Sequence, residues 1–134
     1  MDGQPSPELP GLQLETLCSE LGFSETLNMK RIVAEYVESV AISDNDTART
    51  KMDEYWADGQ MVVDEAEATD RDRVLVGLSI ANAIMLRDAG NIDEMFYALN
   101  RAADLAANTG QFDELDRIDA IIDQLRIVTN TTVN

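Results

Sequence analysis

Residues 74–86 read VLVGLSIANAIML, and only Ser79 and Asn82 are polar in this run. At helical spacing such a segment has no wide face suited to water, so it needs neighbours on every side. The run is shorter than the roughly 20 apolar residues that a transmembrane helix takes. Asp70 precedes it, where the helix dipole favours an acid, and Gly90 follows it, where a left-handed cap favours glycine. The pattern predicts the central helix of a soluble bundle.

The rest of the chain divides into further helical segments separated by short turns. Apolar residues recur at helical spacing in the ranges 12–21, 25–42, 47–67, 94–108 and 112–128. Ser24 is expected to cap the second helix, and Phe112 is expected to be buried in the last. Gly59 lies inside the 47–67 helix, which indicates a close contact or a kink. No useful segment alternates with period two, so we predict an all-α domain of six helices whose consecutive members are antiparallel neighbours.

The two ends of the chain differ from its middle. Residues 1–10 contain all three prolines and are expected to form an irregular, flexible arm. Residues 11–128 carry the helical pattern and form a single predicted domain. Residues 129–134 are polar and are expected to be a frayed tail. The first ten residues have no apolar run, so no signal peptide is predicted, and the expected location is the cytoplasm.

The charge of the chain is strongly one-sided. Twenty-six acidic residues against ten basic ones give a net charge of −16 in 134 residues. A field of that sign repels phosphate backbones and anionic membrane surfaces, so neither nucleic acid nor membrane is predicted as a direct partner. A basic protein is the partner class that the charge favours. The acids also keep a protein in solution, and solvation alone remains an alternative explanation.

The residues that usually carry catalysis are scarce. There is no histidine, which excludes imidazole bases, histidine-based triads and histidine-ligated zinc. Cys18 is the only cysteine, and it shares an apolar helix face with Leu14, Leu17 and Leu21. A core thiol is therefore expected rather than a reactive one. No catalytic residue and no cofactor are predicted from these patterns.

Two predicted helix junctions have similar sequences: residues 89–95 read AGNIDEM and residues 109–115 read TGQFDEL. In both, glycine ends one helix, an apolar residue fills the joint and acids begin the next helix. The segment from Val76 to Thr109 resembles a tetratricopeptide-type helical hairpin. In that resemblance residues 90–92 form the turn, and the packing positions are held by Ala83, Leu99 and Ala102. The resemblance implies a short helical-hairpin array, and a compact six-helix bundle is the alternative.

Four carboxylates suggest an enzymatic alternative. Glu35 and Glu38 form a Glu-x-x-Glu pair, and Glu67 and Asp70 form a later Glu-x-x-Asp pair. The pattern resembles that of the all-α nucleotide pyrophosphohydrolases, which implies that the four residues hold Mg²⁺ and, through it, the nucleotide phosphates. Side chains three apart share a helix face, and hard cations prefer carboxylate oxygens. Asp70 also has a simpler interpretation as the cap of the following helix.

Two sets of residues are candidates for binding. Trp56 is the only tryptophan, and Asp53, Glu54 and Asp58 lie near it in the chain. An exposed tryptophan ringed by acids would suit a basic amphipathic partner. Ser79 and Asn82 form the second set, and they are either hydrogen-bonded across the bundle or polar anchors in a ligand pocket.

These patterns favour a non-enzymatic protein, an adaptor, chaperone-like or regulatory module. It would bind a protein partner through an acidic face or a groove between helices. The alternatives are the Mg²⁺-dependent pyrophosphohydrolase and an acidic mimic of nucleic acid. A homodimer is compatible with all three.

Overall fold

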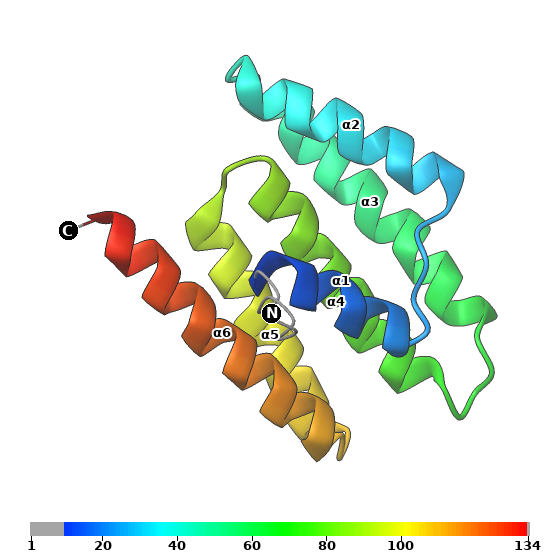
Figure 1. The fold of residues 1–134 in the computed structure, drawn as a ribbon. Coiled ribbons are helices and arrows are strands. Elements are labelled where there is room, and N and C mark those ends of the chain that lie inside the picture. The colour runs from blue at the N-terminus through cyan, green and yellow to red at the C-terminus, as the bar shows by residue number, and fades with distance from the viewer. Residues whose placement is uncertain (1–9, 134) are drawn as a thin grey trace, which may run out of the picture.

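The computed structural model describes residues 10–133, with side chains described for residues 13–129. Figure 1 shows its helices, with no strand among the described residues. They are α1 (Pro10–Glu20), α2 (Leu27–Ala41), α3 (Asn45–Glu65), α4 (Arg71–Asp88), α5 (Ile92–Asn108) and α6 (Phe112–Val133). The predicted all-α fold is confirmed.

Helix α4 is the centre of the fold, as its apolar sequence predicts. It packs against α1, α2, α3 and α5. In the range 74–86 only Leu75 and Ile84 are half-buried, and every other residue is buried. The helix ends at Asp88, and Gly90 in the turn that follows has a φ of +83°, a conformation that favours glycine. Neighbours on several sides thus cover a helix that has no polar face.

Consecutive helices are neighbours everywhere except at the first connection. Helices α2 and α3 pack together, as do α4 with α5 and α5 with α6. Within the described residues α1 does not pack against α2, but lies across α4 and α6. The reason is local: Phe23 is buried against Gly77 of α4, and residues 23–26 then run without helical structure to the start of α2.

Two glycines allow close contacts to α4. A Cβ on Gly59 of α3 would lie 2.3 Å from Cδ1 of the fully buried Leu78. A Cβ on Gly77 would lie 2.6 Å from Cβ of Phe23. The close contact predicted for Gly59 is confirmed, and it brings the backbone of α3 down onto the central helix.

Some predicted helix ends are wrong. Ser24 does not cap α2; the Thr26 hydroxyl accepts a hydrogen bond from the Met29 amide at 3.0 Å. Ser24 lies in the crossing segment, two residues before the helix can begin. Phe112 opens α6 at the α5–α6 turn, where its side chain is 62% exposed, so its expected burial is also wrong. It sits at a helix end with only a turn before it.

The expected end segments also need correction. Helix α6 continues through Val133, so residues 129–133 are helical rather than a frayed tail. No glycine or proline interrupts that stretch, and the Thr129 hydroxyl donates to the Leu125 carbonyl at 3.0 Å. Pro10 begins α1, a position where the missing amide hydrogen does no harm. Residues 1–9 of the predicted arm and residue 134 lie outside the described residues.

Candidate functional site

A groove runs between α3 and α5, with α4 as its floor. In the part of the chain that the structure describes, α3 and α5 each pack on α4 but not on each other. The space between them holds a cavity of about 160 Å³. We call this the α3–α5 groove; its cavity is lined by Met52 and Trp56 from α3, Ser79, Asn82 and Leu86 from α4, and Glu94, Tyr97, Ala98 and Arg101 from α5.

The floor carries the two polar residues of the central helix. Ser79, Asn82 and Leu86 are three and four positions apart, so they share one face of α4. The Ser79 hydroxyl donates to the Leu75 carbonyl of its own helix at 3.3 Å. Asn82 is 6% exposed, and no described group donates a hydrogen bond to its Oδ1. The hydrogen bond expected across the bundle is therefore missing at this oxygen, and the pair instead lines a cavity.

Aromatic rings stand on both sides of the cavity. Trp56 is half-buried in the α3 wall, and Tyr97 is 63% exposed on the α5 wall. The Arg101 guanidinium lies over the Tyr97 ring, 6.0 Å from its centroid. Such cation–π contact favours a fixed position for both side chains. The mouth of the cavity is thus formed by two rings and one arginine.

A second hollow extends the groove toward the α4–α5 turn. It shares Met52, Leu86 and Glu94 with the cavity, and its further lining is Tyr36, Val40, Asn45, Ala48, Arg49 and Asn91. The Asn91 amide donates to the Tyr36 hydroxyl at 2.8 Å, which ties α2 to this turn. Burial raises the pKa of the Tyr36 hydroxyl, so it stays protonated at neutral pH. The groove therefore extends beyond the cavity toward the α4–α5 turn.

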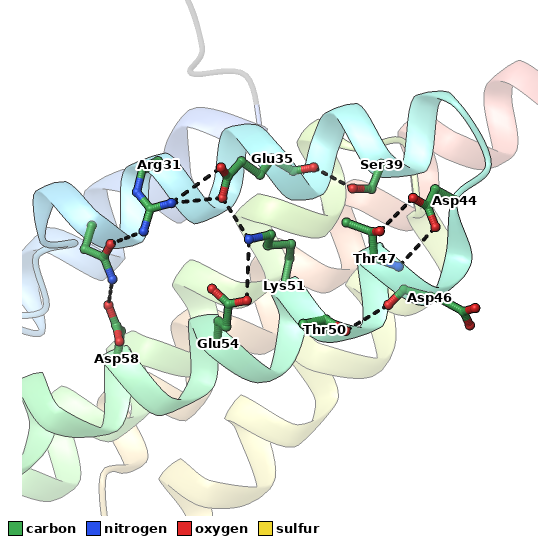
Figure 2. Close-up of polar contacts among 11 residues, drawn as sticks. Arg31, Glu35, Ser39, Asp44, Asp46, Thr47, Thr50, Lys51, Glu54 and Asp58 are labelled. Atoms are coloured by element: carbon green, nitrogen blue, oxygen red, sulfur yellow. Dashed lines mark hydrogen bonds and ion pairs between the residues drawn. The ribbon is translucent and has the colours of Figure 1, made fainter.

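The structure divides the proposed partner-binding set between two faces of α3. Glu54 and Asp58, one turn apart, face α2, where Lys51 contacts Glu54 at 3.4 Å and the Asn28 amide donates to Asp58 (Figure 2). Trp56 lies on the other side of the helix, in the groove. Asp53 is exposed, one turn before Trp56. Of the four described residues predicted to bind a partner, only Asp53 and Trp56 could contact the same partner in the groove.

The face of α3 toward α2 carries a network of charged contacts. The Lys51 ammonium lies 3.0 Å from the Glu35 carboxylate, and the Arg31 guanidinium lies 3.2 Å from the same group (Figure 2). The hydrogen bond from Lys51 holds the pKa of Glu35 below its ordinary value. At the start of α3, Asp44 accepts hydrogen bonds from the amide and hydroxyl of Thr47. These acids have partners within the fold.

The four carboxylates of the hydrolase pattern do not converge. Glu35 is paired with Lys51, in the first half of α3, whereas Glu67 and Asp70 lie in the turn after α3. From Lys51 to the end of α3 the helix rises about 21 Å at about 1.5 Å per residue. Glu38 is exposed on α2. Within the described residues, no three acidic or cysteine side chains are placed to hold a metal ion.

Cys18 is a core thiol, as predicted. It is buried between α1 and α4, and its Sγ donates to the Gly77 carbonyl at 3.4 Å. Burial raises the pKa of the Cys18 thiol to about 12, so almost none of it is thiolate at neutral pH. It lies on the opposite face of α4 from the groove. None of the described helices is long and apolar enough to cross a membrane.

The α5 wall of the groove was not among the predicted binding residues. The buried stripe of α5 consists of Met95, Ala98, Leu99, Ala102, Ala103 and Ala106. Tyr97 falls outside this stripe, and Arg101 follows it by one turn. The sequence did contain a signal for this wall: an aromatic residue outside the apolar stripe is followed one turn later by a cationic residue. It indicates exposure, but not which helix lies opposite.

Comparison of the chain with protein-family models, with curated proteins and with solved structures gives no match. The tetratricopeptide resemblance from Val76 to Thr109 therefore stays a prediction. What the structure contains is an antiparallel α4–α5 hairpin that turns at Gly90 (Figure 1). Its helices meet through small and large buried residues, among them Ala83, Leu99 and Ala102. Function has to be argued from the groove itself.

Proposed function

We propose that this chain is a non-enzymatic interaction module that binds a basic segment of a protein partner in the α3–α5 groove. The observation that carries the proposal is the buried Asn82 Oδ1, which lacks a donor on the floor of a cavity. A buried acceptor left unpaired costs about 1–3 kcal/mol. Native proteins keep few such groups, and each calls for an explanation. A binding partner that supplies the donor is the explanation we adopt.

The lining of the groove supports recognition rather than chemistry. Trp56, Tyr97 and Arg101 belong to the residue types that dominate the energetics of protein interfaces. Around them lie apolar side chains and a few polar groups that can orient an occupant, the usual composition of a binding pocket. Among the described residues, Glu94 is the only carboxylate that lines the cavity, and it is exposed. A paired acid and base are not brought together there.

Charge supports a basic partner. The net charge is −16, and the exposed acids Asp53, Asp93 and Glu94 lie on the two helices that form the groove walls. A field of that sign speeds the approach of a cationic segment. Arg49 and Arg101 offset the acids within the groove. The basic residues of the partner would therefore contact the acidic surface around the groove, and an uncharged side chain of the partner would enter the cavity.

The test uses two equally exposed aromatic residues. Photo-reactive p-benzoylphenylalanine replaces Tyr97 in the groove or, as the control, Phe112 at the α5–α6 turn; their exposures are 63% and 62%. After irradiation in extract of the native cells, mass spectrometry identifies the cross-linked partner segment. We expect one basic segment that is cross-linked from position 97 and not from position 112.

A synthetic peptide of that segment then provides the quantitative step. Its affinity should fall about tenfold or more with Tyr97→Ala, as interface aromatics do, and should be unchanged with Phe112→Ala. Its association rate should fall as salt is raised, because steering by charge is screened. Equal cross-linking from both positions, or a peptide that binds Tyr97→Ala normally, contradicts the proposal.

A further inference from the structure

We propose that the cavity beneath Trp56 and Tyr97 is a site for an aromatic ring that carries a hydroxyl group. This inference rests on the proposed function: the partner segment would anchor itself by inserting a tyrosine side chain. The argument has three parts, namely the size of the cavity, the chemistry of its floor and the charges at its mouth.

The cavity has the size of one aromatic ring. Its volume is about 160 Å³. An engineered apolar cavity of about 150 Å³ in another protein takes up benzene. Met52, Trp56, Leu86 and Ala98 supply ring and aliphatic surface along its sides. Aromatic rings and methionine sulfur both contact an inserted ring favourably.

The floor of the cavity requires a hydrogen-bond donor. Asn82 Oδ1 has no donor among the described residues. The Ser79 hydroxyl already donates to Leu75, so only its acceptor capacity remains. A hydroxyl group both donates and accepts, so it satisfies the Asn82 side chain whichever end of the amide faces it. A bare hydrocarbon ring would leave the Asn82 oxygen unpaired.

Charged side chains do not fit the same floor. A buried ammonium or guanidinium needs a carboxylate beside it, since an unpaired charge out of water is strongly unfavourable. Glu94 is exposed rather than on the floor, and Arg101 lines the same cavity. A carboxylate would meet the acceptor oxygens of Ser79 and Asn82 inside a protein of net charge −16. A neutral phenolic side chain meets both requirements, since it carries a ring and a hydroxyl donor.

Small probes test this directly on the intact chain. The probes are p-cresol, toluene and n-butylammonium, which are the side-chain analogues of tyrosine, phenylalanine and lysine. Binding is followed by the NMR signals of the Trp56 indole N–H and the Asn82 side-chain amide. Trp56 is the only tryptophan, so its indole signal is unambiguous. We expect p-cresol to bind at least tenfold tighter than toluene, and n-butylammonium to leave both signals in place.

Two asparagine variants locate the selectivity. With Asn82→Leu, the preference for p-cresol over toluene should disappear. With Asn100→Leu on the exposed side of α5, it should stay as in the wild type. The preference measured on the wild type stands by itself if Asn82→Leu does not fold. Equal binding of p-cresol and toluene, tighter binding of n-butylammonium, or a preference that survives Asn82→Leu each overturns the inference.

The cross-linking experiment separates this inference from the proposed function. A basic segment cross-linked at position 97 that binds without any tyrosine refutes the phenol site and leaves the groove as the partner site. Selective p-cresol binding without any partner cross-linked at position 97 supports the phenol site and refutes the groove as the partner site. A tyrosine-to-phenylalanine change in the bound peptide that weakens its affinity at least tenfold supports both.

Discussion

The two walls of the groove are attached to the protein in different ways. Helix α3 is joined to α2 by an exposed network around Lys51 and Glu35, and it meets α4 at the close contact of Gly59 with Leu78. Helix α5 lies along α4 through a buried stripe that includes Leu99 and four alanines. The first attachment combines these ion pairs with buried side chains such as Met29, Ile32 and Tyr55, whereas the second is a buried apolar stripe. The α3 wall is therefore the one that conditions such as salt and pH should affect.

The largest effect is expected at the shared floor. Leu78→Ala removes a fully buried side chain of α4 beneath Gly59 and should lower the free energy of unfolding by about 2–5 kcal/mol. Ile84→Ala, at a half-buried position of the same helix, should cost less. Urea unfolding measures both. An unchanged midpoint for Leu78→Ala would show that α4 is not the organising helix.

The contact between Gly59 and Leu78 should decide whether Gly59→Ala lowers or raises the free energy of unfolding. In the wild type, Gly59→Ala places a methyl group 2.3 Å from Leu78 Cδ1 and should destabilise the fold by about 1–3 kcal/mol. In a Leu78→Ala background the same change should stabilise it by up to about 1 kcal/mol, because alanine favours helix more than glycine does. A double-mutant cycle in urea gives the coupling. Equal effects in both backgrounds would mean that the two residues do not meet.

A smaller effect is expected where α2 begins. Thr26→Ala removes the oxygen that accepts from the Met29 amide and should cost about 1 kcal/mol. The control is Ser24→Ala, which should stay within about 0.5 kcal/mol of the wild type, as surface changes usually do. Thermal or urea unfolding distinguishes them. The reverse order would restore Ser24 as the cap.

The smallest effect belongs to the exposed network between α2 and α3. Glu35→Gln should lower stability at neutral pH by less than Thr26→Ala does, because ion pairs at the protein surface contribute little. Lys51 lowers the pKa of Glu35 in the folded state, so its stabilisation is present above the ordinary carboxyl pKa and is lost as pH falls through the lowered value.

The difference between the wild type and Glu35→Gln should therefore vanish in acid, and also in about 1 M salt, where charges are screened within about 3 Å. Urea midpoints at three pH values and two salt concentrations measure it. Glu38→Gln, also on the exposed surface of α2, is the matched control and should show no such dependence. A difference that persists in acid and in salt would show that the network is held by something other than charge.

Features of the fold that depend on local sequence could be predicted. An apolar run without a polar face needs neighbours on all sides, which made residues 74–86 the central helix, and Gly90 marked its end. Prediction failed where a choice depends on distant parts of the chain. Whether Ser24 or Thr26 caps α2 depends on where the helix can begin after Phe23 is buried against α4.

The site was predictable in part for the same reason. Ser79 and Asn82 stand out because they interrupt an apolar helix, and that signal is local. The acids grouped with Trp56 were adjacent only in the chain, since packing on α2 turned Glu54 and Asp58 away from it. Tyr97 became a groove residue through the orientation of α5 against α4, which periodicity alone does not give.

The reactivity of Cys18 can report whether binding in the groove affects the opposite face of α4. Cys18 is sealed against Gly77 on one face of α4, whereas the groove occupies the other face. Cys18 is 8% exposed, so a maleimide or iodoacetamide should alkylate its thiol faster when α1 moves away from α4, and the alkylation rate then reports on that opening. If an occupant of the groove slows alkylation, α4 transmits order from one face to the other; if the rate stays the same, the two halves of the protein respond independently.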